Sequence, residues 1–298
     1  MISVVVITAG AIAFIEYRRQ IISYLTHWKG GPSSTEPYLP FPEQPNFHIA
    51  AAGDTGDAGS RLDSTGVAIE RIGEQYPFDA LLLLGDLVYP SGDPSKLQSL
   101  VDEPFAGVLD QGAELLAILG NHDVKSDQGD QIMHDLGMPG RYWARTFGEV
   151  LVVGLDSTEM DDAAQLTFLE STLANSEANW KIVALHHPPY SAGYQGSSKD
   201  ARRTFSPIFE RYGVQLVLSG HDHDYQRSEP INGVTYVVSG AGSGTRRTGE
   251  DDFTAVAYSF IHFTDVAVFD DQLVIRAVDT AGRVADEATI MLGSVPSD

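Results

Sequence analysis

The stretch VQLVLSGHDHDYQR, residues 214–227, places two histidines directly after a short apolar run. Residues 214–218 have the character of a strand that is buried on both faces. In an extended chain, side chains two residues apart point to the same side, so His221 and His223 can converge on one object while Asp222 faces away. A polar turn after a core strand is the alternative explanation, and the other strand ends decide between the two.

Four more apolar runs are followed by a polar side chain of a metal-binding type. These positions are Asp54, Asp86, Asn121 with His122, and His186. One such residue is usually a turn or a helix cap. Ligands of open α/β sheets bind outside the carboxyl ends of the strands. Five such ends therefore predict that carboxylates, an amide and imidazoles meet in one crevice.

The same runs define the fold class. Residues 164–173 carry a helical apolar stripe that Asp161 or Asp162 can cap, and residues 206–212 are a shorter helix candidate. Residues 258–292 have the pattern of strands without helices. This order predicts an α/β domain with layered sheets and outer helices. The runs expected to be buried strands are 47–52, 80–84, 115–119, 150–155, 182–185, 214–218 and 234–238.

Composition limits the possible functions. The chain has 298 residues, 43% of them hydrophobic and 20% charged, which is ordinary for a globular protein with an ample core. It has no cysteine, which excludes disulfides, thiolate catalysis and cysteine-bound metal sites. With 19 Lys and Arg against 41 Asp and Glu, the formal net charge is −22. Such a surface repels nucleic acid, so no nucleic-acid partner is expected.

The types of the candidate ligands indicate which metals they can bind. Oxygen and imidazole ligands without sulfur suit iron, manganese or zinc. One carboxylate can bridge two ions about 3.5–4 Å apart, and such two-metal sites catalyse in-line displacement at phosphorus. Bound metals would also supply the local cations that an acidic chain needs to receive an anionic substrate.

Five motifs give the chain a family resemblance. The order GDTG (53–56), GDLVY (85–89), GNHD (120–123), VALH (183–186) and GHDH (220–223) resembles the calcineurin-like metallophosphoesterases. Gly56 stands where many of these enzymes have histidine, and Tyr89 lies three residues after Asp86. Both features are similar to the small, single-domain purple acid phosphatases of the tartrate-resistant acid phosphatase type. The resemblance implies a four-layer α/β/β/α sandwich and a metal-dependent phosphoric ester hydrolase.

The resemblance also implies a ligand set and a mechanism. Hydrolysis of a small phosphomonoester would proceed by in-line attack of a metal-bound hydroxide. Asp86 would act through the metals, and His122 would contact the substrate or protonate the leaving group. A phenolate ligand such as Tyr89 favours a ferric ion. The implied ligands are Asp54, Tyr89 and His223 for Fe(III), Asn121, His186 and His221 for a second Fe, Zn or Mn ion, and Asp86 as the bridge.

Three further residues are candidates for substrate contact. His187 adjoins His186 and should face away on an extended chain, which favours a structural role. Gln195 stands near the place of a histidine in small animal members of the family, and glutamine cannot donate a proton as an acid. Arg246 follows a glycine-rich turn and can receive phosphate, with a surface loop as the alternative.

Three acidic residues stand beside the candidate ligands. Asp123, Asp222 and Asp224 are expected either to orient ligating histidines or to remain solvated charges.

The N-terminal part differs from the rest of the chain. Residues 2–15 carry no charge but are shorter than the about 20 residues of a membrane span. We therefore expect residues 1–29 to be a hydrophobic anchor or export signal, with possible membrane association. Arg18 and Arg19 follow this stretch, and the positive-inside rule would place them in the cytoplasm. A cytoplasmic protein is thus the alternative.

A Pro/Gly-rich segment precedes the motifs. Residues 30–45, GGPSSTEPYLPFPEQP, have the composition of a linker without regular structure. The catalytic domain is accordingly expected to span residues 46–298.

Two other functions fit the same residues. One is phosphodiester or nucleotide pyrophosphate hydrolysis at the same two-metal site. The other is a non-catalytic phosphate-binding or surface protein with a relic metal site. The sequence leaves the natural substrate and the oligomeric state open.

Overall fold

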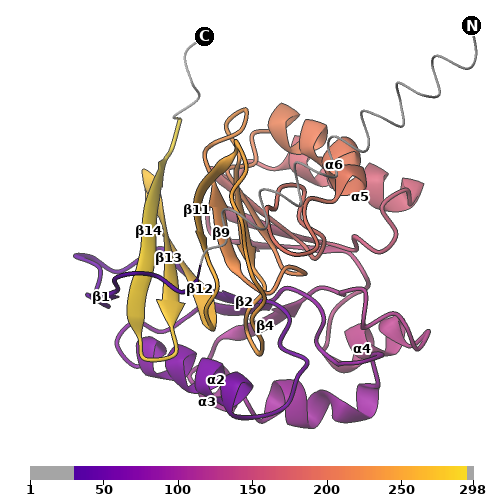
Figure 1. Ribbon diagram of the computed structural model, residues 1–298. Helices are drawn as coiled ribbons and strands as arrows, with labels where there is room; N and C mark the ends of the chain where they lie inside the picture. The colour runs from indigo at the N-terminus through magenta and orange to yellow at the C-terminus, as the bar shows by residue number, and fades with distance from the viewer. Residues whose placement is uncertain (1–29, 294–298) are drawn as a thin grey trace, which may run out of the picture.

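The computed structural model describes residues 30–293, in which two mixed β-sheets pack face to face and helices cover their outer faces (Figure 1). This is the four-layer α/β/β/α arrangement expected from the sequence.

Each sheet has seven strands. The first sheet contains β1 Glu36–Pro37, β2 Phe47–Ala52, β3 Ala80–Leu83, β4 Glu114–Ala117, β12 His262–Val268, β13 Gln272–Asp279 and β14 Arg283–Met291. The second contains β5 Trp143–Phe147, β6 Val150–Leu155, β7 Trp180–Leu185, β8 Leu216–Ser219, β9 Tyr225–Ser228, β10 Thr235–Ser239 and β11 Thr254–Tyr258. The helices are α2 Ser60–Gly73, α3 Ala106–Asp110, α4 Gly129–Asp135, α5 Ala163–Asn175 and α6 Lys199–Arg211, with short turns of 3-10 helix at Pro94–Lys96 and π-helix at Gln98–Asp102.

Each sheet contains a run of parallel strands. The first sheet runs β1-β14-β13-β12-β2-β3-β4 and the second β11-β9-β10-β8-β7-β6-β5. Strands β2, β3 and β4, at one end of the first sheet, are parallel to one another, as are β6, β7, β8 and β10 in the second, whereas the remaining strands pair antiparallel with their neighbours. Helices α2 and α3 lie on the first sheet and α5 and α6 on the second (Figure 1). Parallel strands bring their carboxyl ends to one edge, where α/β folds bind ligands.

The predicted strands are all present, and two of them, residues 47–52 and 150–155, have the predicted bounds. Helix α5 is also confirmed, and Asp162 caps it by accepting a hydrogen bond from the Ala164 amide at 2.9 Å. The short candidate at 206–212 is the end of α6, which begins seven residues earlier. Its first turns, KDARR, carry no apolar stripe, so periodicity alone missed them.

Two tryptophans join the sheets through the core. Trp143 Nε1 donates to the Ala117 carbonyl at 2.7 Å, which links β5 to the end of β4. Trp180 Nε1 donates to the Phe269 carbonyl at 3.1 Å, which links β7 to the end of β12. A buried indole N–H needs such a partner. The two bonds therefore fix how one sheet lies on the other.

Residues 30–45, the strap, pack on the folded domain. Glu36 and Pro37 pair with β14, and the Tyr38 hydroxyl donates to Asp265 at 2.7 Å. Phe41 is only 4% exposed and packs edge-on against His48. Apart from the two-residue strand Glu36–Pro37 the segment has no regular structure, as its composition predicts, but it packs on the surface of the domain. The aromatic side chains within the Pro-rich segment bury enough apolar surface to hold it in place.

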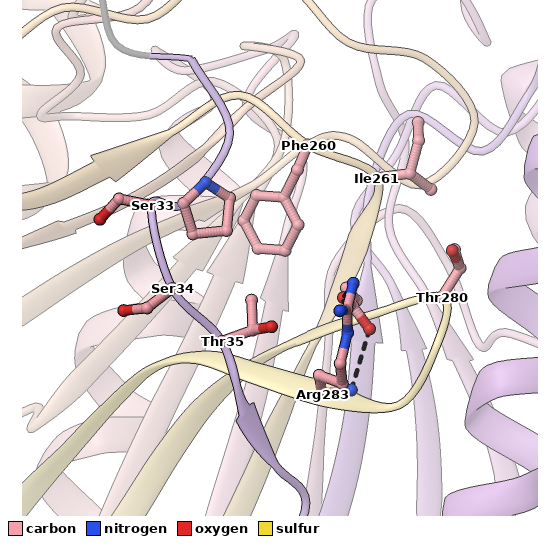
Figure 2. Close-up of a pocket in the computed structure, with 9 residues that line it drawn as sticks. Ser33, Ser34, Thr35, Phe260, Ile261, Thr280 and Arg283 are labelled. Atoms are coloured by element: carbon pink, nitrogen blue, oxygen red, sulfur yellow. Dashed lines mark hydrogen bonds and ion pairs between the residues drawn. The ribbon is translucent and has the colours of Figure 1, made fainter.

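The strap also forms one wall of a surface pocket. Ser33, Ser34 and Thr35 run beside Phe260 and Ile261, opposite the β13–β14 turn with Thr280 and Arg283 (Figure 2). The pocket has a volume of about 520 Å³. It shows that the strap follows the surface of the domain before it enters β1.

The expected anchor or export signal at residues 1–29 lies outside the described residues. From residue 30 to residue 293, no helix is both long and apolar enough to cross a membrane.

We predict that Phe41→Ala lowers the free energy of unfolding by about 3 kcal/mol, because it removes a buried ring and leaves a cavity. Urea denaturation monitored by tryptophan fluorescence would measure the change. Leu39→Ala is the matched control, because Leu39 is 67% exposed, and its effect should stay within about 0.5 kcal/mol. Equal, small effects of both changes on the free energy of unfolding would show that the packing of the strap does not stabilise the domain.

Candidate metal centre

The five predicted strand ends come together at one edge of the two sheets. The Gly53 amide donates to the Ser239 carbonyl at 2.8 Å, which joins the end of β2 to the end of β10. Within each sheet, the Asp54 amide reaches the Gly85 carbonyl at 3.0 Å, and the Gly220 amide reaches the His186 carbonyl at 3.1 Å. The loops that follow the parallel strands therefore share one crevice.

The hydroxyl of Tyr89 lies between three polar groups. Its Oη is 2.9 Å from Asp54 Oδ1, 3.1 Å from Asp86 Oδ2 and 3.1 Å from His223 Nε2. His223 Nε2 in turn lies 3.3 Å from Asp54 Oδ1. The single proton of the Tyr89 hydroxyl cannot be donated to both carboxylates and the imidazole at once. More lone pairs than protons therefore point to this position. Such crowding of oxygen and imidazole donors is typical of a cation site.

A second group of donors lies on the other side of Asp86. Asp86 Oδ1 is 3.5 Å from His186 Nε2, and donor atoms of Asp54, Asp86 and His186 lie within 4.8 Å of one another. The His221 ring is centred 5.1 Å from the His186 ring. His186 Nε2 and Asn121 Oδ1 are buried, and neither has a hydrogen-bond partner among residues 30–293. Buried polar atoms without a partner are rare, and a metal ion would satisfy both.

The backbone at three of these positions adopts the left-handed conformation. Its φ angle is 56° at Asp54, 53° at Asp86 and 72° at His221. Residues other than glycine seldom occupy this region, and such strain is concentrated at functional sites. Close approach adds a further constraint at Gly120, where a Cβ atom would lie 2.3 Å from Asp86 Oδ1. The strand ends are thus shaped to place side chains rather than to minimise local energy.

The charges of the candidate metal ligands affect one another's pKa values. Burial opposes the charge on both Asp86 and His186, but their mutual attraction outweighs it. The pKa of Asp86 falls below its usual range and that of His186 rises to about 10. Burial and the carboxylates of Asp54 and Asp86 raise the pKa of Tyr89. A metal ion binds the deprotonated forms of such ligands, so it would displace protons from His186 and Tyr89.

His122 borders the Tyr89 side of the cluster. Its backbone amide donates to Asp86 Oδ1 at 2.7 Å, and its ring is centred 4.6 Å from the Tyr89 ring. Nδ1 lies 2.7 Å from the Pro90 carbonyl, which can only accept a hydrogen bond, so Nδ1 carries a proton. Nε2 is then the ring nitrogen that can face a substrate, and Lys125 Nζ lies 2.9 Å from Nε2 and 3.0 Å from Nδ1.

His187 borders the other side. The expectation that it faces away is wrong, because its ring is centred 4.6 Å from the His221 ring. β7 ends at Leu185, so the alternation of an extended strand does not continue to residue 187. Burial, and then the charge of His186, lower the pKa of His187 to about 4.

Gln195 and Arg246 lie on two loops that adjoin the cluster. The amide of Gln195 donates to Asp222 Oδ1 at 2.6 Å, and the amide of Arg246 donates to the His223 carbonyl at 2.7 Å. The Arg246 guanidinium lies 5.2 Å from the centre of the Tyr194 ring. Both residues are exposed, and it is their backbone amides that contact residues next to the site. That their side chains contact the substrate stays a prediction.

The neighbouring acids are buried, so the expectation of solvated charges is wrong for them. Asp123 accepts hydrogen bonds from the amides of Leu87, Val88 and Gly120, while burial and then Asp86 raise its pKa to about 7. Asp222 accepts from Ser191 Oγ at 2.5 Å. Burial raises the pKa of Asp222 and of Asp224. These carboxylates brace the loops that carry the candidate ligands.

Comparisons with known proteins agree with this geometry. The family model described as calcineurin-like phosphoesterase matches residues 47–225. Purple acid phosphatase 17 of Arabidopsis thaliana is 30% identical over 227 residues, which cover 64% of this chain and 67% of that protein. Tartrate-resistant acid phosphatase type 5 of Mus musculus is 26% identical over 239 residues, covering 67% and 73%. The resemblance seen in the motifs is therefore confirmed.

Solved structures share the fold. The purple acid phosphatase PPD1 from yellow lupin (Lupinus luteus) seeds superposes with a TM-score of 0.72 at 20% identity, covering 85% of this chain and 55% of that one. GAP50, described as the anchor in the inner membrane complex of Plasmodium, has a TM-score of 0.75 at 17% identity, covering 84% and 90%. At these identities the likeness concerns the fold alone.

We predict that Asp86→Ala loses both bound metals, because the two oxygens of this carboxylate face the two groups of donors. Elemental analysis of purified protein would measure the metal content. Asp110→Ala, which removes an exposed carboxylate of α3 that belongs to none of the five motifs, should keep the wild-type content. An Asp86→Ala protein with full metal content would exclude a bridging role.

Proposed function

This chain belongs to the calcineurin-like phosphoesterase family, and from that membership we propose that it hydrolyses phosphomonoesters at a two-metal centre. It is a metal-dependent phosphoesterase, and its relatives are named acid phosphatases. The preference for monoesters, the identity of the metals and the role of each residue are parts of the proposal.

The cluster around the Tyr89 hydroxyl carries the proposal. A tyrosine within about 3 Å of two carboxylates and an imidazole supports a hard cation held through a phenolate, for which Fe(III) is the best match. The first ion would be held by Asp54, Tyr89 and His223. Asn121, His186 and His221 would hold a second Fe, Zn or Mn ion, and Asp86 would face both.

Two ions bound here would activate a water nucleophile and stabilise the charge that develops on the phosphoryl group. The chain has its own part in this chemistry. Its buried acids Asp123 and Asp222 hold the ligand loops in place through backbone amides. The cations Lys125 and Arg246 lie at the border of the site and would offset the formal charge of −22 for an incoming phosphate.

His122 is the residue that we assign to the leaving group. Its Nδ1 proton is committed to the Pro90 carbonyl, so Nε2 remains to contact the substrate oxygen. Lys125 Nζ lies 2.9 Å from Nε2 and 3.0 Å from Nδ1, so it places a positive charge beside the ring at the border of the site. Gln195 has no acidic proton and does not share this role.

We predict that the metal-loaded protein has a higher kcat/KM for p-nitrophenyl phosphate than for bis-p-nitrophenyl phosphate between acid and neutral pH. A monoester leaves a doubly charged phosphate to be neutralised, which suits two cations. A preference for the diester would keep the metal centre but overturn the substrate class, pointing to phosphodiesterase or pyrophosphatase activity. No hydrolysis of either ester by metal-loaded protein would favour a relic site.

We predict that His122→Ala lowers kcat by about 100-fold, the lower range for loss of a general acid. Its metal content should stay unchanged, because the His122 side chain is not among the proposed ligands. His134→Ala is the matched control, since the His134 side chain is 83% exposed on α4 and should leave kcat unaltered. A kcat for His122→Ala within a few-fold of the wild type would show that His122 does not protonate the leaving group.

A further inference from the structure

We propose that Ser157 fixes His187 as a hydrogen-bond donor to the bound phosphate, on the side of the centre formed by His186 and His221. The proposal rests on the proposed function, which places a phosphate at this centre. Ser157 would be a positioning residue, and His187 would be the residue that contacts the substrate.

Ser157 and His187 are joined by two hydrogen bonds. The backbone amide of His187 donates to Ser157 Oγ at 2.9 Å, and the same oxygen lies 2.9 Å from His187 Nδ1. Ser157 is 1% exposed and follows the end of β6, whereas His187 follows the end of β7. The hydroxyl therefore joins two neighbouring strand ends at the edge that carries the metal centre.

The positions of the protons follow from these distances. An amide N–H can only donate, so Ser157 Oγ is the acceptor of that bond. The hydroxyl proton then needs an acceptor, and within residues 30–293 the remaining partner of this oxygen is His187 Nδ1. Nδ1 must accept, so a neutral imidazole carries its proton on Nε2. The ring is thereby set as a donor at the atom that does not face Ser157.

The ring lies where a donor would meet the phosphate. Its centre is 4.6 Å from the His221 ring and 5.1 Å from the His186 ring, both proposed ligands of the second ion. The side chain is half-buried, and its Nε2 has no hydrogen-bond partner in the described part of the chain. A phosphate oxygen held at that ion would be an acceptor for this proton.

The support behind Ser157 is rigid. The preceding residue, Asp156, is buried, its amide donates to Gln165 Oε1 at 2.7 Å, and its Oδ1 accepts from the Thr158 amide at 2.8 Å. Arg141 Nη1 contacts Asp156 Oδ2 at 3.3 Å. A donor that is oriented in advance loses little freedom when the substrate binds, which is how such groups favour a transition state.

A pair of substitutions at His187 tests the donor. The amide nitrogen of glutamine reaches the place of Nε2, whereas that of asparagine reaches only the place of Nδ1. We expect His187→Asn to weaken binding of inorganic phosphate by about tenfold or more and His187→Gln to stay within about threefold of the wild type. Titration calorimetry of metal-loaded protein with phosphate would measure this, with metal content determined for each variant. Equal affinities of the two variants would overturn the proposal.

A double-mutant cycle tests the positioning role of Ser157. Ser157→Ala should weaken phosphate binding less than His187→Asn, and adding it to His187→Asn should cause no further loss, because Ser157 acts through His187. Independent losses that multiply in the double variant would contradict this role. The phosphate titration does not depend on turnover. Failure of the wild type to hydrolyse esters would therefore count against the proposed function and leave the test of His187 intact.

Discussion

The carboxylate of Asp54 is the point on which the centre depends. Its Oδ2 accepts the His221 amide at 2.7 Å, and its Oδ1 faces the Tyr89 hydroxyl and His223. Asp54 is fully buried, and a buried carboxylate is costly unless charge and hydrogen bonds compensate it. One residue at the end of β2 thus ties the first sheet to the His221–His223 turn of the second. The contacts that join the two sheets at Asp54 leave lone pairs of its carboxylate pointing into the crevice. The same residue that connects the sheets therefore also favours the binding of a cation.

The sequence predicted the parts of this arrangement that follow from strand periodicity. Continuous apolar runs gave the parallel strands, and the polar residue after each run gave the candidate ligands, because carboxyl ends must meet at one edge. The left-handed backbone at Asp54, Asp86 and His221 was not predictable. Aspartate and histidine can adopt the left-handed conformation but do not prefer it, so tertiary contacts must impose it.

Other features escaped the sequence for related reasons. The composition of the strap indicates its irregular backbone but not its packing on the domain, because that packing depends on the ring of Phe41 meeting Tyr76 and Phe269, which are distant in sequence. His187 was misplaced because alternation holds only to the end of β7. The acids Asp123 and Asp222 were expected to be solvated or to orient histidines. Both are buried, and each accepts backbone amides from a loop more than 25 residues away in sequence, a long-range contact that local patterns do not contain.

Two imidazoles that are not proposed ligands flank the centre, and their surroundings give them different chemistry. His122 lies beside Tyr89; its Nδ1 proton is donated to the Pro90 carbonyl, and the exposed ammonium group of Lys125 lies near both ring nitrogens. His122 can therefore exchange a proton with solvent. His187 stands beside His221 with its Nδ1 closed by a buried hydroxyl, so it can donate a hydrogen bond but has no relay to replace a lost proton. A phosphate between them would thus be held from the second-ion side while its leaving group is protonated from the Tyr89 side. This asymmetry is set by Pro90 and Ser157, two residues that no metal-binding pattern would single out.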